Sequence, residues 1–168
     1  MKKLLAELFT GLLAVVCLFT ICACAPAPTL DINEAKKTLE ENGYEVSVTD
    51  EDFYEYEYAM EKMLSAYHED YDDGIYIYEF KDKGMAKKYY EEKKASFDLE
   101  LKELKALIET KEYYLKEYSD KISSDEIDEI EDSIKECKND LEEAEEIVFG
   151  HNGNFVWYGT KDAIEATK

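Results

Sequence analysis

The chain has 168 residues, and its 41 acidic residues outnumber 20 basic ones, all of them lysine, so the formal net charge at pH 7 is −21. A surface of that sign repels the phosphates of nucleic acids and the head groups of anionic lipids. The composition therefore argues against nucleic-acid binding and against a purely electrostatic attachment to membranes. The chain is also short for a two-lobed solute receptor.

The N-terminal segment has the pattern of an export signal. Lys2 and Lys3 precede an apolar run that extends from Leu8 to Ala23, and a charged head before an apolar middle is typical of secretory signals. A membrane-spanning anchor needs roughly 17 to 25 apolar residues, so the run is at the limit for an uncleaved anchor. Pro26 and Pro28 follow it and cannot continue a helix, which favours cleavage.

Three of the four cysteines lie near the end of this signal. Ile21, Cys22, an alanine and Cys24 follow one another, and they resemble the lipobox of bacterial lipoproteins, although Cys22 stands where another residue is usual. The resemblance implies that diacylglycerol is attached to the Cys24 sulfur and that residues 1–23, with Cys17 and Cys22, are removed. Two acyl chains anchor firmly, because burial contributes about 0.8 kcal/mol per methylene. Ordinary cleavage after "ACA" or "APA" is the alternative, and it would leave a proline directly after the cut.

We expect residues 24–30 to form a short tether and residues 31–168 to form one domain. Its first element is a helix, because Asp31 and Glu34 have the spacing of a capping box and Asn42–Gly43 is a typical helix end. A strand follows, because apolar and polar residues alternate from Tyr44 to Val48.

The segment from Asp52 to Tyr67 gives conflicting signals. Its first tyrosines alternate with other residues as in a strand, but residues such as Met60 and Met63 follow helical spacing, and we predict a helix. Asp70 to Gly74 is predicted to be a turn. Ile75 to Phe80 is apolar on both faces and is therefore predicted to be a central strand.

No glycine or proline occurs from Met85 to Phe149. Apolar residues recur there at steps of three and four in two series, and Ser123 with Glu126 forms a capping box between the series. The pattern predicts an antiparallel coiled-coil hairpin inserted at about 95–149. The first series is Phe97, Leu101, Leu104, Ile108, Leu115, Tyr118 and Ile122, interrupted by Lys111, and the second is Ile127, Ile130, Ile134, Cys137, Leu141, Ala144 and Val148.

The two predicted arms of the hairpin differ in charge. Residues 95–123 contain 5 lysines and 7 acidic residues, whereas residues 124–149 contain 2 lysines and 12 acidic residues. The second arm should therefore present a strongly acidic surface.

The C-terminal part is predicted to contain a turn at Gly150–Gly153, a strand at Asn154–Tyr158, and a short helix that begins after Thr160 and runs to Lys168. The expected fold is α+β: a small three-stranded antiparallel sheet with helices packed on it and the long coiled-coil hairpin inserted. The segments "LEENGYEVSV", "IYIYEFKDKGMAKKYYEE" and "GNFVWYGTKDAIEA" resemble uncharacterised small lipoproteins of low-GC Gram-positive bacteria. This resemblance concerns fold and location, and it implies no site residues.

The stretch "HEDYDDG" suggests a calcium loop at first sight. If Gly74 took the sixth position of an EF-hand loop, Tyr71 and Phe80 would fall at positions three and twelve, which require oxygen ligands. We therefore expect a solvated turn there. His68 and His151 have no neighbours at metal-ligand spacing, and we expect surface or turn positions for both.

Cys137 lies at a core position of the second arm, and no histidine in either arm could activate it as a nucleophile. We expect a small buried apolar group, with an interchain disulfide as the alternative. The tyrosines and Trp157 suit a core by their spacing, although a platform for stacking sugars is an alternative. We predict no catalytic residue, no metal site and no cofactor.

These patterns predict a lipid-anchored protein at the extracytoplasmic face of a bacterial cell membrane, not an enzyme, that contacts other proteins through the helical hairpin. The partner is expected to be an envelope protein or a second copy of the chain. A small-ligand or cation-binding lipoprotein is the alternative function. An exposed apolar patch on the hairpin would favour the first function, and a concave tyrosine-lined pocket would favour the second.

Overall fold

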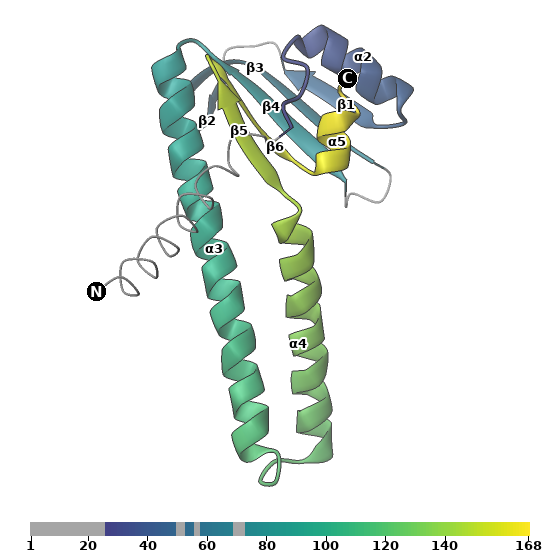
Figure 1. The fold of residues 1–168 in the computed structure, drawn as a ribbon, viewed down its shortest axis with the longest axis vertical. Coiled ribbons are helices and arrows are strands. Elements are labelled where there is room, and N and C mark those ends of the chain that lie inside the picture. Colours follow the sequence, from purple (N-terminus) through teal and green to yellow (C-terminus); the bar gives the residue numbers. More distant parts are fainter. Residues whose placement is uncertain (1–25, 50–52, 56–57, 69–72) are drawn as a thin grey trace, which may run out of the picture.

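The computed structural model describes residues 26–49, 53–55, 58–68 and 73–168. The predicted signal and Cys24 lie outside these residues. The helices are α2 (Ile32–Glu41), α3 (Lys83–Tyr118), α4 (Ser124–Glu145) and α5 (Lys161–Glu165), and the strands are β1 (Glu45–Thr49), β2 (Phe53–Glu55), β3 (Tyr58–Tyr67), β4 (Gly74–Phe80), β5 (Val148–Asn152) and β6 (Phe155–Gly159). Figure 1 shows a sheet with helices against it and two long helices extending from one end.

The described strands form one antiparallel sheet. Five of them follow the order β1-β3-β4-β6-β5, and the short β2 pairs with β3 beside this path. The predicted three-stranded sheet is therefore wrong. The prediction included β1, β4 and β6 and missed β2, β3 and β5. Of these, β3 is central because it pairs with both β1 and β4.

Strand β3 occupies most of the segment for which we predicted a helix. An irregularity in its pairing with β4 lies between Met60 and Lys62. Such a bulge inserts an extra residue and shifts the alternation of the strand. Met60 and Met63 consequently pack against the same cluster, while Leu64 belongs to the cluster on the other face. Apolar residues three positions apart also share one face of a helix. The spacing of Met60 and Met63 therefore led to the wrong prediction of a helix.

Strand β5 occupies part of the predicted Gly150–Gly153 turn. Gly150 lies within the strand and pairs with Trp157 of β6. A Cβ atom on Gly150 would lie 2.3 Å from Cζ2 of the Trp157 ring, so the glycine permits the close approach of the indole. The actual turn of this hairpin is at Gly153, whose φ is +61°.

The predicted starts of three helices and the central position of β4 are confirmed, whereas most of the predicted Asp70–Gly74 turn lies outside the described residues. The Asp31 side chain accepts hydrogen bonds from the amides of Asn33 and Glu34 at the start of α2, and β4 pairs with strands on both sides. Ser123 and Glu126 form the predicted capping box of α4, and Thr160 caps α5.

Helices cover both faces of the sheet. On one face, α2 and α5 bury an apolar cluster that includes Leu39, Ile77 and Trp157. On the other face, the first turns of α3 pack on Tyr58, Tyr78 and Phe80 of the sheet, and the α3 side chain at the centre of this contact is Tyr89, which is 1% exposed. We call this second face the tyrosine face.

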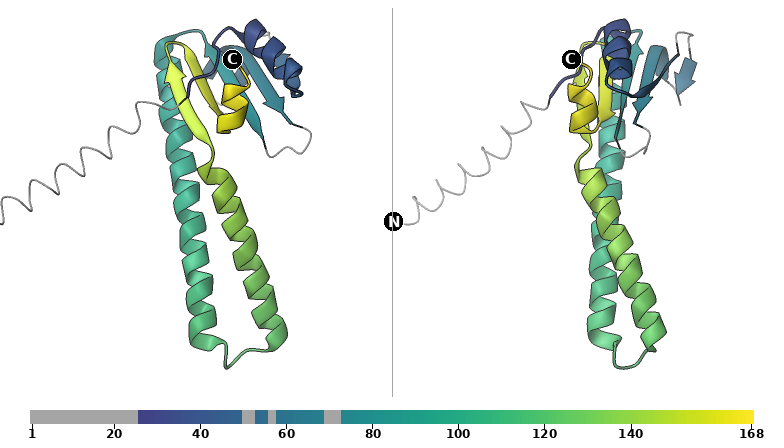
Figure 2. Two further views of the ribbon diagram at one scale, coloured as in Figure 1. Left: turned by 45° about the vertical axis from the view of Figure 1, so that its right-hand side comes forward. Right: turned by 90° about the vertical axis from the view of Figure 1, so that its right-hand side faces the viewer.

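Beyond the sheet, α3 and α4 run side by side in opposite directions (Figures 1 and 2). We call α3 from Leu99 onward, the connection 119–123 and α4 the helical arm. Ion pairs join the helices, with Lys105 Nζ 2.6 Å from Glu145 and Lys138 Nζ 2.7 Å from Glu112. Helix α4 ends at Glu145, so Val148, which we expected in the second helical series, belongs to β5.

The lysine that interrupts the apolar series of α3 has a partner across the arm. The Lys111 ammonium group donates a hydrogen bond to Ser133 Oγ of α4 at 2.7 Å. The long lysine side chain can pack its methylenes between the helices while its charge reaches a polar group. Lys111 therefore fits the contact between the helices.

Hydrogen bonds join the two ends of the described chain near α2. The Thr29 amide donates to Thr167 Oγ1 at 2.9 Å, and Thr167 is fully buried. The backbone oxygen of Thr167 accepts a hydrogen bond from the Thr38 hydroxyl of α2 at 2.9 Å. In the part of the chain that the structure describes, no helix is both long and apolar enough to cross a bilayer.

Candidate functional site

Two adjoining hollows lie near the base of the helical arm. The first, which we call the aromatic hollow, has a volume of about 260 Å³ and lies at one end of the tyrosine face. It is lined by Tyr67, Tyr76, Phe97, Phe149 and Tyr158, together with Ile147, Gly74, Gly159 and Thr160.

The rings of the aromatic hollow form a continuous wall. The Tyr67 and Tyr76 centroids are 5.5 Å apart, and Tyr76 and Tyr158 are 5.0 Å apart. Phe149 continues the wall at 5.2 Å from Tyr158 and 4.9 Å from Phe97 of α3. Because each ring contacts the next at the usual distance of an aromatic pair, neighbouring rings hold one another in place. All five rings are half-buried, so the wall is accessible to a ligand.

Gly74 keeps the Tyr67 end of the wall in position. It pairs directly with Tyr67 across β3 and β4. A Cβ atom on Gly74 would lie 2.9 Å from Tyr67 Cδ1, so the glycine lets the phenol ring lie over the backbone. A side chain at this position would clash both with the Tyr67 ring and with the Ala66 backbone oxygen, which lies 2.8 Å from the same Cβ position.

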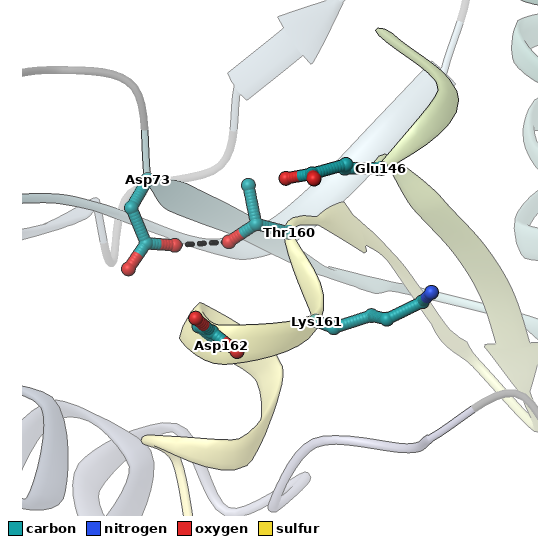
Figure 3. Close-up of a pocket in the computed structure, with 5 residues that line it drawn as sticks. All are labelled: Asp73, Glu146, Thr160, Lys161 and Asp162. Atoms are coloured by element: carbon teal, nitrogen blue, oxygen red, sulfur yellow. Dashed lines mark hydrogen bonds between the residues drawn. The ribbon is translucent and has the colours of Figure 1, made fainter. Parts of the chain in front are cut away.

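The second hollow, which we call the acidic hollow, has a volume of about 240 Å³ and is lined by Asp73, Glu146, Thr160, Lys161 and Asp162 (Figure 3). Three carboxylates and one ammonium group give it a net negative charge. The Lys161 side chain extends away from Asp73. Among the described residues, neither Glu146 nor Asp162 has an ion pair or a side-chain hydrogen bond.

Asp73 has a structural role in this hollow. Its carboxylate accepts hydrogen bonds from the Tyr44 hydroxyl and the Thr160 hydroxyl. Thr160 Oγ1 in turn accepts from the Ala163 amide at 3.2 Å, which caps α5. Burial of the phenol, and then its hydrogen bond to Asp73, raise the pKa of Tyr44 far above its ordinary value. Asp73 thus links β4 to α5 and to the start of β1. Glu146 and Asp162 are the carboxylates of this hollow that remain available to a ligand.

The two hollows share a border. Thr160 lines both of them, and Glu146 of the acidic hollow is followed directly by Ile147 of the aromatic hollow. The residues that connect α4 to β5 therefore contribute a carboxylate to the acidic hollow and, one position further on, an apolar side chain to the aromatic hollow, and Phe149 of the wall follows two residues later. Neither hollow was predicted from the sequence, because their residues come from four separate parts of the chain.

A different candidate surface lies on the helical arm itself. Leu99, Leu107, Tyr114 and Tyr118 follow one another at steps of eight, seven and four, which places them along one side of α3. They are between 40% and 55% exposed. We call them the exposed row. Tyr118, which we expected between the helices, stacks instead on Tyr114 with 5.0 Å between the ring centroids.

The other residues singled out in the sequence are not brought together. His68 is exposed at the end of β3, edge-on to Tyr44, whereas His151 is exposed on β5, where we expected a turn, and stacks on Tyr90. Cys137 is half-buried on α4. Glu69 to Asp72 of the "HEDYDDG" stretch lie outside the described residues.

Within the described part of the chain, no cluster of three or more histidine, cysteine or acidic side chains is placed to hold a metal ion. The aromatic platform that the sequence left open as an alternative to a core has a counterpart in the aromatic hollow, but Trp157 is not part of it. Trp157 faces the opposite side of the sheet and packs in the core beneath α2 and α5. The comparisons with known proteins identify no relative: no family model, no curated protein and no solved structure matches this chain.

Proposed function

We propose that the chain is a non-catalytic interaction protein, held by lipid on Cys24 at the extracytoplasmic face of a bacterial cell membrane, and that the helical arm is its contact element. The observation that carries this proposal is the exposed row on α3. Apolar side chains gathered on an otherwise charged surface commonly mark a protein–protein contact. The sequence around Cys24 supports the location through its resemblance to a lipobox.

The packing of the arm supports the same conclusion. Ile108 and Ile134 are the only buried residues of the arm, and the other apolar side chains between α3 and α4 are half-buried. Two helices have too little surface to cover each other's apolar faces completely. A third helix laid along α3 would cover the exposed row and part of the contact between α3 and α4, and burial of apolar area contributes about 25 cal/mol per Å².

The charge of the arm indicates which charge its partner should carry. Helix α4 contains eleven acidic residues and two lysines. This charge attracts a partner with lysine or arginine beside its apolar face and disfavours a second copy that would bring another α4 close. We therefore expect a different envelope protein with a basic amphipathic helix.

Crosslinking in living cells tests this proposal. A photoreactive amino acid is placed at Leu107 or Tyr114 in the exposed row, and at Glu109 on another side of α3 as the matched control. We expect the first two positions to capture the same partner and Glu109 to capture little of it, because only the row faces the contact. Capture should weaken as salt rises if the acidic surface contributes.

Two outcomes would contradict the proposal. Equal capture from Leu107 and Glu109 would show unspecific proximity at the cell surface. Absence of any adduct from the row, with the protein folded and present in normal amount, would show that the arm makes no stable contact. An adduct of twice the chain's own mass would identify a second copy as the partner and would contradict the charge argument.

A further inference from the structure

The aromatic hollow is a binding surface of a different kind from the exposed row. It lies where α3, β4, β6 and the start of β5 meet, and its rings remain half-buried in a concave site. Concave apolar sites with a few polar groups at the edge are typical of small-molecule binding. At about 260 Å³ the hollow is below the roughly 300–1,000 Å³ of sites for drug-sized ligands, so it suits a small ligand.

The electrostatics of the site select the charge of that ligand. The faces of tyrosine and phenylalanine rings attract cations through their quadrupole, by about 0.5–1 kcal/mol at exposed sites. Glu146 and Asp162 add two carboxylates in the adjoining acidic hollow, and neither is paired within the described chain. Lys161 also lines that hollow, but its side chain extends away from Asp73. An anion would be repelled both by the faces of the rings and by the carboxylates. A cation with an apolar body could pack its body against the rings and place its charge near the carboxylates.

We propose that the aromatic hollow and Glu146 bind a small organic cation, an ammonium group carried on an apolar or planar body. The body packs against the wall formed by Tyr76, Tyr158 and Phe149. The ammonium group lies at the Thr160 border, between the rings and the Glu146 carboxylate. This site goes beyond the proposed contact role of the arm and does not depend on it.

Three probes with the same phenyl body and different charge test the proposal: 2-phenylethylammonium, 2-phenylethanol and phenylacetate. Binding to the full chain in lipid nanodiscs is measured by calorimetry, with empty nanodiscs as the reference for partition into lipid. We expect the cation to bind most tightly and the anion least. Equal affinity for the three probes, or no binding of the cation to the folded protein, would overturn the proposal.

Variants then assign the binding to this site. Glu146→Gln removes the border charge without changing the shape of the side chain, and we expect affinity for the cation to fall about two- to fivefold, as for an exposed ion pair, while the alcohol is unaffected. The matched control is Glu131→Gln, an exposed residue of α4 that lies 15 residues away along the helix. At about 1.5 Å per residue this is roughly 22 Å, well beyond the screening length of about 10 Å at 0.1 M salt.

The aromatic wall is tested with Tyr76→Leu, which keeps an apolar side chain and removes the ring. We expect a loss of about fivefold or less for the cation and a smaller loss for the alcohol, because only the cation interacts with the ring quadrupole. Near-ultraviolet circular dichroism and thermal unfolding establish that the variant is folded. An equal effect of Glu131→Gln and Glu146→Gln would show attraction by net charge, and this result would also overturn the assignment.

Discussion

At the scale of single residues, a few glycines and one aspartate determine how closely neighbouring strands and helices pack. Gly150 and Gly74 each admit an aromatic ring of a paired strand, Trp157 in one case and Tyr67 in the other. Asp73 joins Tyr44 to Thr160, residues 116 positions apart in the chain. The sheet and both hollows depend on these few positions.

Gly150→Ala should destabilise the protein. The added Cβ would lie 2.3 Å from the Trp157 ring, which is 4% exposed and held in the core. Overpacking of this kind costs about 1–3 kcal/mol, and urea unfolding would measure it. Gly84→Ala is the matched control, because the nearest atom there is the end of the Asp82 side chain at 3.0 Å. An unchanged unfolding midpoint for Gly150→Ala would show that the indole does not lie against β5.

The pKa of Tyr44 predicts a dependence of stability on pH. Burial and the hydrogen bond to Asp73 raise this pKa, so the folded protein keeps the phenol proton at a pH where the unfolded chain releases it. The resulting stabilisation is fully present below the unfolded pKa of about 10 and is lost as the pH rises above that value.

Tyr44→Phe should therefore be less stable than the wild type at pH 8, by about 1 kcal/mol for the lost hydrogen bond, and the difference should shrink as the pH rises above about 10. Urea unfolding at a series of pH values measures this difference. Tyr113→Phe, which alters an exposed phenol of the arm, serves as the control and should give a curve parallel to that of the wild type. A constant difference between wild type and Tyr44→Phe would show that Tyr44 has the same pKa in both states.

At the scale of secondary-structure elements, local signals predicted the helices better than the strands. The caps at Asp31, Ser123 and Thr160 use only neighbouring residues, so they could be recognised in the sequence. The bulge in β3 and the glycine in β5 depend on the facing strand, and for that reason those two strands were missed. The hollows were missed for the same reason, although a platform formed by tyrosines and Trp157 had been one alternative.

The fold of the sheet should survive removal of the arm. Phe97 and Phe149 contact each other, so the two ends of the arm are close enough for a short linker. Tyr89 lies before the arm and would still cover the tyrosine face. We expect a chain with residues 99–145 replaced by a flexible linker to unfold cooperatively, as measured by circular dichroism in urea.

Tyr89→Ala in the intact chain provides the contrast to this deletion. Tyr89 is 1% exposed, and its loss should cost about 3–5 kcal/mol, as for other large aromatic residues in cores. If the deletion proves as damaging as Tyr89→Ala or abolishes cooperative unfolding, the arm supplies stability that the sheet requires.

At the scale of the whole molecule, the first described residues pack with the sheet domain, whereas the tip of the arm lies far from it. The Thr29 amide is bonded to Thr167, and Pro28 is buried, so only residues 24–27 separate the proposed lipid from the folded sheet. Four residues span at most about 14 Å. The connection between α3 and α4 lies at the far end of the molecule from the sheet (Figure 1). An anchor at Cys24 would thus keep the sheet near the membrane and leave the tip of the arm distant from the attachment point.

Cys24→Ala tests this arrangement. If Cys24 carries the lipid, the variant should either leave the membrane fraction or remain as an uncleaved precursor, since the strongly acidic surface offers no electrostatic attachment to anionic lipid. Cys137→Ala is the matched control: it removes a half-buried thiol of α4, and the protein should remain in the membrane fraction with its normal mature mass. Mass spectrometry of the wild type should show a lipid-modified N-terminal cysteine. A mature wild-type chain that begins at an unmodified residue beyond Cys24 would refute the anchor, and the arm would then have to find its partner without the membrane to position it.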